Sequence, residues 1–139
     1  ISVSVNAELI LPNKDLKPVE VLKIQLKALK KNDVPSKDFG INQTWVFAHP
    51  NNKLVTGPLS KFTNMIYSES YKILINHHSH EIKEVFKNDF KYIYVVQIIT
   101  KEKKFFLYEW HVEKGNEKNC NNCWFTSVVS SPIEQGSSI

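Results

Sequence analysis

Apolar residues recur every three or four positions along the first third of the chain. After Pro18, the residues Val19, Leu22, Leu26 and Leu29 would lie on one side of a helix. Lysines occupy most of the other side, and lysines in the last turn suit the helix dipole. The pattern predicts an amphipathic helix with one buried face, ended by the turn residues 32–35.

Two shorter helices are expected next. The first is predicted over residues 37–48, with Pro50 as its stop, because the residue before a proline avoids the α region. The stretch HPNNKLVTGPL then carries dense turn chemistry. A second short helix would begin after it, capped by Thr56 or Gly57 with Pro58 in the first turn. The stretch would therefore join a helix end to a helix start.

After about residue 70 the period changes to two, and β-branched and aromatic residues dominate. Residues 71–75 could form a strand or a last helical turn. Strands are predicted over residues 81–86, 90–100, 105–112 and 124–129. A polar loop is expected over residues 115–122.

Helices followed by antiparallel strands predict an α+β fold, in which a curved sheet covers the helical face. Residues 1–16 are expected to form an N-terminal arm, residues 17–130 a single domain, and residues 131–139 a flexible tail. A length of 139 residues is typical of one domain. Such a domain buries enough surface to fold without a metal or disulfide staple.

The charge of the chain changes this picture little. The net charge of +4 comes from lysine alone, since the sequence contains no arginine. Abundant lysine, asparagine and isoleucine indicate an AT-rich genome, which weakens a functional interpretation of the charge. Arginine supplies the forked contacts that read guanine and phosphate, so we expect no nucleic-acid partner. No apolar run reaches the roughly 18 residues needed for a membrane span.

The compartment is not predicted by the sequence. The chain begins with Ile1 rather than Met, so we expect an upstream segment that could have carried an organelle signal. Two cysteines, Cys120 and Cys123, are too few for a disulfide framework. They favour a soluble protein of a reducing compartment.

Several local signatures resemble the NTF2-like superfamily, in which a bent sheet wraps around a long helix. The segments are VEVLKIQLKAL, WVFAHPNNKLVTGPLSKFTNMI and the closing strand CWFTSV, which together span about residues 18–129. More narrowly, they resemble an uncharacterised NTF2-like family, a domain of unknown function found in plants, algae and bacteria. The resemblance implies an NTF2-like or cystatin-like cone but no particular activity.

Members of this superfamily often hold a small ligand between sheet and helices, in an aromatic-lined pocket. The resemblance therefore implies a pocket for a small apolar ligand near the open end of the cone. The candidate ligand-binding residues are Trp45, Phe47, His49, Gln97 and Glu109. The alternative is that the aromatic residues are simply core, with Gly57 and Pro58 serving only as a helix entry.

Glu109 and His111 form the candidate catalytic pair. They lie two residues apart on one face of a predicted strand, with Gln97 on the neighbouring strand. If that face is concave, the pair could transfer protons, as pocket acids do in superfamily enzymes such as ketosteroid isomerase. The opposite expectation places the pair on the solvent side, because the other face of the strand is wholly apolar.

A zinc site is the runner-up among metal hypotheses. Cys120 and Cys123 supply half of a tetrahedral site, and His77 and His80 could supply the rest through tertiary contact. The alternative is a polar loop with a buried cysteine. No phosphate-binding glycine loop and no nucleophile elbow is present in the sequence, and we expect no metal and no cofactor.

The leading functional hypothesis is a non-catalytic binding or scaffolding module with a small apolar pocket. A protein partner or a homodimer through the sheet could accompany it, with an apolar strand face available for pairing. The residues of that face are Phe106, Tyr108, Trp110 and Val112. The alternative is a small-molecule isomerase or hydrolase that uses Glu109 and His111.

Overall fold

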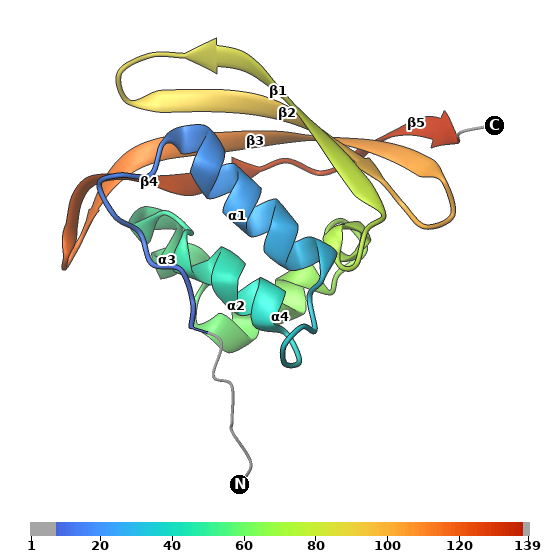
Figure 1. Cartoon of the computed structure of the whole chain (residues 1–139), viewed down its shortest axis with the longest axis horizontal. Coiled ribbons are helices and arrows are strands. Elements are labelled where there is room, and N and C mark those ends of the chain that lie inside the picture. The colour runs from blue at the N-terminus through green and yellow to red at the C-terminus, as the bar shows by residue number, and fades with distance from the viewer. Residues whose placement is uncertain (1–7, 138–139) are drawn as a thin grey trace, which may run out of the picture.

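The computed structural model describes residues 8–137 and has an α+β fold, as the sequence predicts. Four helices come first, and a five-stranded antiparallel sheet follows them. The helices lie together on one face of the sheet, while none of residues 8–137 forms a further layer on the other face (Figure 1). The helices are α1 (Pro18–Lys30), α2 (Phe39–Val46), α3 (Pro50–Thr56), α4 (Leu59–Ile66) and the short 3₁₀ helix η1 (Lys72–Leu74). The strands are β1 (Ser79–Lys87), β2 (Lys91–Ile99), β3 (Lys104–Glu117), β4 (Cys120–Val129) and β5 (Ile133–Ser137).

Helix α1 is the amphipathic helix that the pattern predicts. Pro18 occupies its first turn, and Glu20 accepts a hydrogen bond from the Lys17 amide at 3.0 Å. The side chains of Leu22, Leu26 and Leu29 are fully buried against the sheet and the other helices. Burial of such side chains stabilises the fold by about 1.5–3 kcal/mol each.

The stretch HPNNKLVTGPL differs from the expected turn, because most of it is helix α3. His49 caps α3, since its Nδ1 accepts the Asn51 amide at 3.2 Å, and Pro50 is the first helical residue. A proline lacks only the amide that the first turn leaves unpaired, so it starts a helix as readily as it stops one. Helix α2 nevertheless ends before Pro50, as expected. The predicted caps of the next helix are wrong, because Thr56 and Gly57 are the last residue and the C-cap of α3, and Pro58 is itself the N-cap of α4.

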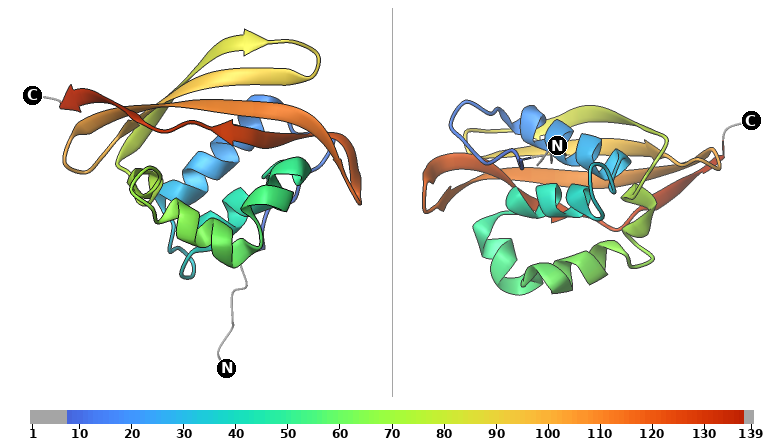
Figure 2. Two further views of the ribbon diagram at one scale, coloured as in Figure 1. Left: turned by 180° about the vertical axis from the view of Figure 1, so that it is seen from behind. Right: turned by 60° about the horizontal axis from the view of Figure 1, so that its bottom comes forward.

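The sheet has the order β1-β2-β3-β4, and β5 pairs with the same edge of β3 that β4 uses. Strand β4 pairs with the second half of β3, from Trp110 onward, and β5 pairs with residues Lys104 to Leu107. Figure 2 shows β3 as a long strand within the sheet, and β4 and β5 follow one another along the same edge of it. The sheet therefore presents one continuous inner face to the helices.

Two segments differ from the sequence predictions. The expected polar loop over residues 115–122 is the end of a hairpin, with β3 and β4 joined by the turn residues 118–119. Residues 133–137, expected in a flexible tail, form β5. Both segments gain backbone hydrogen bonds to β3, a partner that an apolar side-chain pattern does not reveal. Residues 71–75, for which a strand and a helical turn were both expected possibilities, contain the 3₁₀ helix η1.

The N-terminal arm is fixed to the helices from residue 10 onward. The Ile10 amide donates to Gln43 Oε1 at 2.8 Å, and Gln43 Nε2 donates to the Ile10 carbonyl, also at 2.8 Å. This paired contact holds the arm beside α2. Residues 1–7, which are part of the predicted arm, lie outside the described residues.

Candidate ligand-binding cavity

A cavity of about 330 Å³ lies between the helices and the inner face of β3 and β4. We call it the helix-lined cavity. Apolar side chains form most of its wall, and none of its lining residues carries a formal charge at neutral pH. The lining residues are Gln25, Leu29, Thr44, Ala48, Asn52, Val55, Thr56, Phe62, Met65, Ile66, Tyr71, Leu74, Trp110, Thr126, Ser127, Val128 and Val129.

A hydrogen-bond network forms the floor of the helix-lined cavity. Gln25 Oε1 accepts from Trp110 Nε1 at 3.2 Å and from Thr126 Oγ1 at 2.5 Å. Gln25 Nε2 donates to the Thr44 carbonyl at 3.1 Å. Gln25 is completely buried in the middle of the leucine face of α1. These polar groups already form hydrogen bonds with one another. The floor therefore has few free donors or acceptors for a ligand.

Two contacts to the end of β4 close the sides of the cavity. The Tyr71 hydroxyl donates to the Val129 carbonyl at 2.8 Å, and its ring stacks on Tyr108. Burial raises the pKa of Tyr71, so the phenol stays protonated and keeps donating. On the other side, the Asn52 amide donates to the Ser127 carbonyl. These contacts fix the cavity wall to α3 and to the segment after α4.

The predicted ligand-binding residues Trp45, Phe47 and His49 do not line the helix-lined cavity. The ring of Trp45 packs on Phe62 at 5.1 Å between centroids and lies under the Lys53 ammonium. Phe47 is fully buried. Trp45 and Phe47 thus pack on their neighbours, outside the lining of the helix-lined cavity.

His49 has a structural role in addition to capping α3. Its Nε2 lies 3.0 Å from the Lys114 carbonyl, an acceptor, while Nδ1 accepts the Asn51 amide. The two contacts define the neutral tautomer with hydrogen on Nε2. A Cβ at Gly115 would lie 2.7 Å from this Nε2, so the close approach of β3 requires glycine there. His49 thus joins the start of α3 to the end of β3.

Gln97, Glu109 and His111 lie on the outer face of the sheet, away from the helices. Alternation along β2 places Gln97 opposite to the buried Val96 and Ile98. Alternation along β3 places Glu109 and His111 opposite to the buried Tyr108 and Trp110. His111 Nε2 lies 2.6 Å from Glu109 Oε1, so the catalytic pair is within hydrogen-bond reach. Neither residue lines the helix-lined cavity, and the Glu109 side chain is 54% exposed. The pair therefore lies outside the helix-lined cavity, on the opposite face of the sheet.

The two halves of the predicted zinc site lie at opposite ends of the sheet. His80 pairs with Ile98 and hence lies level with Phe106 of β3, whereas Cys123 lies opposite Gly115. These two positions on β3 are separated by about 30 Å of extended strand. Within residues 8–137, no three His, Cys, Asp or Glu side chains gather where they could hold a metal ion.

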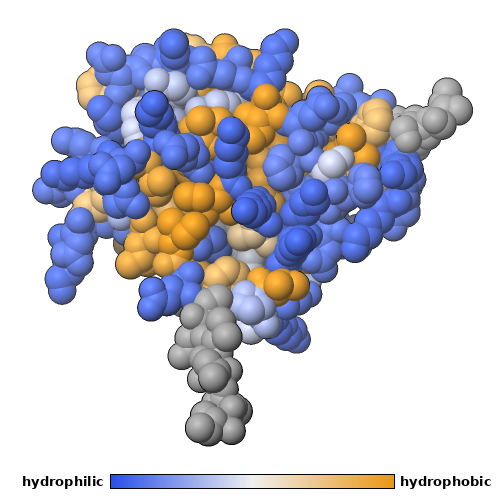
Figure 3. Space-filling view, in the orientation of Figure 1, coloured by the Kyte–Doolittle hydropathy of each residue, from blue (hydrophilic) through white to orange (hydrophobic). Residues whose placement is uncertain are grey.

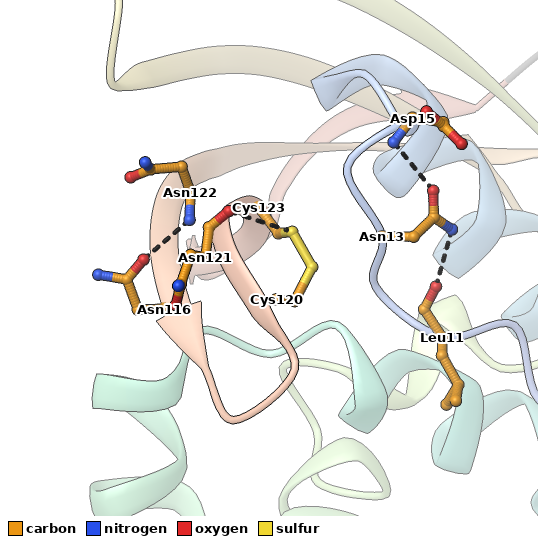
Figure 4. Close-up of a disulfide and its surroundings, with 8 residues drawn as sticks. All are labelled: Leu11, Asn13, Asp15, Asn116, Cys120, Asn121, Asn122 and Cys123. Atoms are coloured by element: carbon orange, nitrogen blue, oxygen red, sulfur yellow. Dashed lines mark hydrogen bonds between the residues drawn. A yellow bond between two sulfur atoms is a disulfide. The ribbon is translucent and has the colours of Figure 1, made fainter.

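Each half of that predicted site has its own structural role. Cys120 and Cys123 form a disulfide, packed against Phe125, so neither offers a thiolate. The bond lies at the end of the β3–β4 hairpin, with the arm residues Leu11, Asn13 and Asp15 in its surroundings (Figure 4). The disulfide removes the argument that the two cysteines favour a reducing compartment.

His77 and His80 bind each other. His77 Nδ1 lies 2.7 Å from the Leu74 carbonyl, and Nε2 lies 2.7 Å from His80 Nδ1. Burial lowers the pKa of His77 to about 4 and also lowers the pKa of His80. His77 is therefore neutral near pH 7, and it ties the end of η1 to the start of β1.

No family model, curated protein or solved structure matches the chain. None of the helices in residues 8–137 is long and apolar enough to cross a membrane.

Sequence reasoning missed the floor of the helix-lined cavity. Gln25, Thr44 and Thr126 form it, and none of them belongs to a recognisable motif. One signal was present, because Gln25 interrupts the apolar stripe of α1 between Leu22 and Leu26. A polar residue on a buried helix face requires a buried partner, and here the partners are on β3 and β4.

Proposed function

We propose that the chain is an NTF2-like binding module that holds a small apolar molecule in the helix-lined cavity. The observation that carries the proposal is a cavity of about 330 Å³ with a mostly apolar wall and an internally bonded polar floor. Ligand sites of folded proteins are typically apolar concavities of about 300–1,000 Å³ with few polar groups. The curved sheet over an amphipathic helix supports the NTF2-like assignment.

The composition of the wall defines the ligand class. The lining contains no carboxylate, ammonium or imidazole group, so burial of a charged ligand would lack a counter-charge. Tyr71 is the one ionisable side chain in the lining, and its hydroxyl is bonded to the Val129 carbonyl. A neutral, largely hydrocarbon molecule fits these surroundings. The same lack of acid and base groups favours binding over catalysis by the cavity.

A fluorescence titration with Nile red, a neutral apolar dye, tests the proposal. Val55 lines the cavity and is 71% exposed, so Val55→Trp adds bulk at the cavity without removing a core side chain. We expect wild type to bind the dye and Val55→Trp to weaken binding about tenfold or more. Val85→Trp is the matched control, because Val85 is half exposed on β1 outside the cavity lining. Equal dye binding by all three proteins would contradict the proposal.

A second candidate function, self-association through the sheet, is supported by the outer face. Of the residues first predicted for it, Tyr108, Trp110 and Val112 are buried, and Phe106 packs against the same core. The prediction that they form an exposed pairing surface is therefore wrong. The opposite face instead carries half-buried apolar side chains with no covering layer in residues 8–137 (Figure 2). They are Ile93, Val95, Ile99, Phe105 and Leu107.

Sedimentation equilibrium tests this pairing. We expect a concentration-dependent dimer that Leu107→Lys abolishes, because an ammonium at the centre of the face would be desolvated in the dimer. The control is Lys83→Gln on the edge strand β1, which should leave the dimer intact. A wild-type chain that remains monomeric at high concentration would rule the dimer out.

A further inference from the structure

The outward side of α1 carries a row of unpaired positive charge. Lys23, Lys27, Lys30 and Lys31 are all exposed. Spacings of four and three place Lys23, Lys27 and Lys30 on neighbouring turns of the helix. None of these four lysines forms an ion pair with a carboxylate of residues 8–137. From Val21 to Lys31 the chain contains no acidic residue.

An apolar groove runs beside these lysines. Its volume is about 390 Å³, and most of its surface is hydrocarbon. Figure 3 shows apolar surface, flanked by hydrophilic residues, on the side of the molecule that faces the viewer in Figure 1. The lining residues are Ile10, Lys23, Ile24, Lys27, Ala28, Lys31, Val34, Phe39 and Gln43. We call the groove and its lysines the α1 basic face.

Aliphatic side chains stand out from the α1 basic face instead of packing inward. Ile10 is 48% exposed and Val34 is 62% exposed, and Leu11, next along the arm, is 63% exposed. The double hydrogen bond between Gln43 and the Ile10 backbone fixes the arm at this position. The contact thus keeps the side chain of Ile10 beside the lysines of the groove.

The nearest carboxylates of the sequence are engaged at the two ends of α1. Glu20 accepts the Lys17 amide at the start of the helix. After the helix, Asp33 Oδ1 accepts from the Asn32 side chain at 3.1 Å and from the Asp38 amide at 2.9 Å. Asp38 accepts from the Asn32 side chain and from the Tyr67 hydroxyl. The middle of α1 is left with cations and aliphatic groups.

We propose that the α1 basic face docks on a membrane surface that contains anionic phospholipids. A basic face with apolar side chains matches the two layers of a bilayer interface, since lysines meet the headgroups and aliphatic groups enter the acyl boundary. A nucleic-acid backbone or an acidic peptide would satisfy the lysines but would leave Leu11 and Val34 without a partner. Charge complementarity and exposed hydrocarbon on one face thus favour the membrane.

Vesicle flotation tests the docking. We expect the chain to float with phosphatidylcholine vesicles that contain about 30% phosphatidylserine, and to stay behind with phosphatidylcholine alone. The triple variant Lys23→Gln, Lys27→Gln, Lys31→Gln should lose affinity on the order of 100-fold, from about fivefold per lysine. Salt at about 0.5 M should release the wild type from the vesicles.

Two further variants separate docking by this face from attraction by net charge. The control is Lys83→Gln, Lys87→Gln, Lys118→Gln, which removes the same charge from exposed positions on β1 and on the β3–β4 turn. We expect less than about a threefold loss for this control. Leu11→Ser with Val34→Ser keeps the charge and should weaken binding about tenfold, because less hydrocarbon is buried.

Three results would overturn the proposal. The first is no binding of wild type to the anionic vesicles. The second is equal loss of binding in the two lysine triples, which would reduce the effect to net charge. The third is unchanged binding of the Leu11, Val34 double variant, together with retention of wild type on a polyanionic resin such as heparin. That result would identify an acidic macromolecule, not a membrane, as the partner.

Discussion

The two faces of β3 lie in different surroundings. Tyr108 and Trp110 point toward the helices and are 1% exposed, whereas Glu109 and His111, interleaved with them, lie on the opposite face. The inner face forms core and cavity floor, and the outer face has no covering layer within residues 8–137 (Figure 1). Neighbouring residues of one strand therefore differ in burial according to whether their face of the sheet is covered by the helices.

The largest effect should come from truncating a side chain of the inner face. Trp110→Ala removes a buried ring and leaves Gln25 without its indole donor, so we expect a loss of about 4 kcal/mol in the free energy of unfolding. The matched change on the outer face, His111→Ala, should cost less than about 1 kcal/mol. Urea denaturation measures both. Similar losses for the two variants would contradict the assignment of the faces.

Acidification should lower the free energy of unfolding, because the buried His77 is neutral in the folded chain. Burial lowers the pKa of His77 in the folded chain to about 4, below the ordinary value of 6.5. The unfolded chain therefore binds the proton first, so this stabilisation is complete above pH 6.5 and is lost as the pH falls toward 4. The loss is about 3 kcal/mol.

Urea denaturation across that pH window checks the titration of His77. The variant His77→Asn keeps a donor for the Leu74 carbonyl and should show a flatter pH dependence than wild type. Gln97→Leu, which removes no titratable group, provides the comparison from the outer face, and it should leave the wild-type slope between pH 6.5 and pH 4 largely in place. A wild-type slope retained by His77→Asn would show that other groups cause the acid sensitivity.

Replacing a glutamine on each face compares the polar contacts directly. Gln25→Leu keeps the volume but removes the acceptor of Trp110 Nε1 and Thr126 Oγ1, so we expect a loss of about 2 kcal/mol. Gln97→Leu, on the outer face, should change the free energy of unfolding by less than about 0.5 kcal/mol. A double-mutant cycle of Gln25→Leu with Thr126→Val should show coupling between the two residues.

The smallest effect is expected for the ion pair of the outer face. Glu109→Gln removes the carboxylate that lies 2.6 Å from His111 Nε2, but the Glu109 side chain is 54% exposed. Pairs at such exposed positions contribute about 0–1 kcal/mol. Thermal unfolding and Nile red binding should therefore both stay close to wild type. Loss of dye binding in Glu109→Gln would link the outer face to the cavity.

The elements of the fold were predictable where side-chain period alone decides them. Helix α1 follows from its leucine spacing, and the alternation along β3 correctly groups Tyr108 with Trp110 and Glu109 with His111. Strand β5 was not predictable, because backbone bonds to the free edge of β3 hold it. The helix α3 was missed because Pro50 is compatible with either the end or the start of a helix.

The candidate site was less predictable, since it depends on contacts between distant parts of the chain. Gln25, Trp110 and Thr126 meet only after the helix packs on the sheet. His49 was conspicuous in its motif, yet both of its ring nitrogens are used in backbone contacts. Residues with distinctive chemistry were therefore assigned to function, while the cavity is built from ordinary leucine, threonine and glutamine side chains.

The central claim is that a small apolar ligand binds on the inner face of the sheet. Amide chemical shifts of the ¹⁵N-labelled chain, recorded while Nile red is added, test it most directly. The account predicts that the largest shifts occur at Leu29, Trp110 and Thr126, around the helix-lined cavity. Shifts concentrated at Val95 and Leu107 on the outer face, with the cavity residues unchanged, would contradict it.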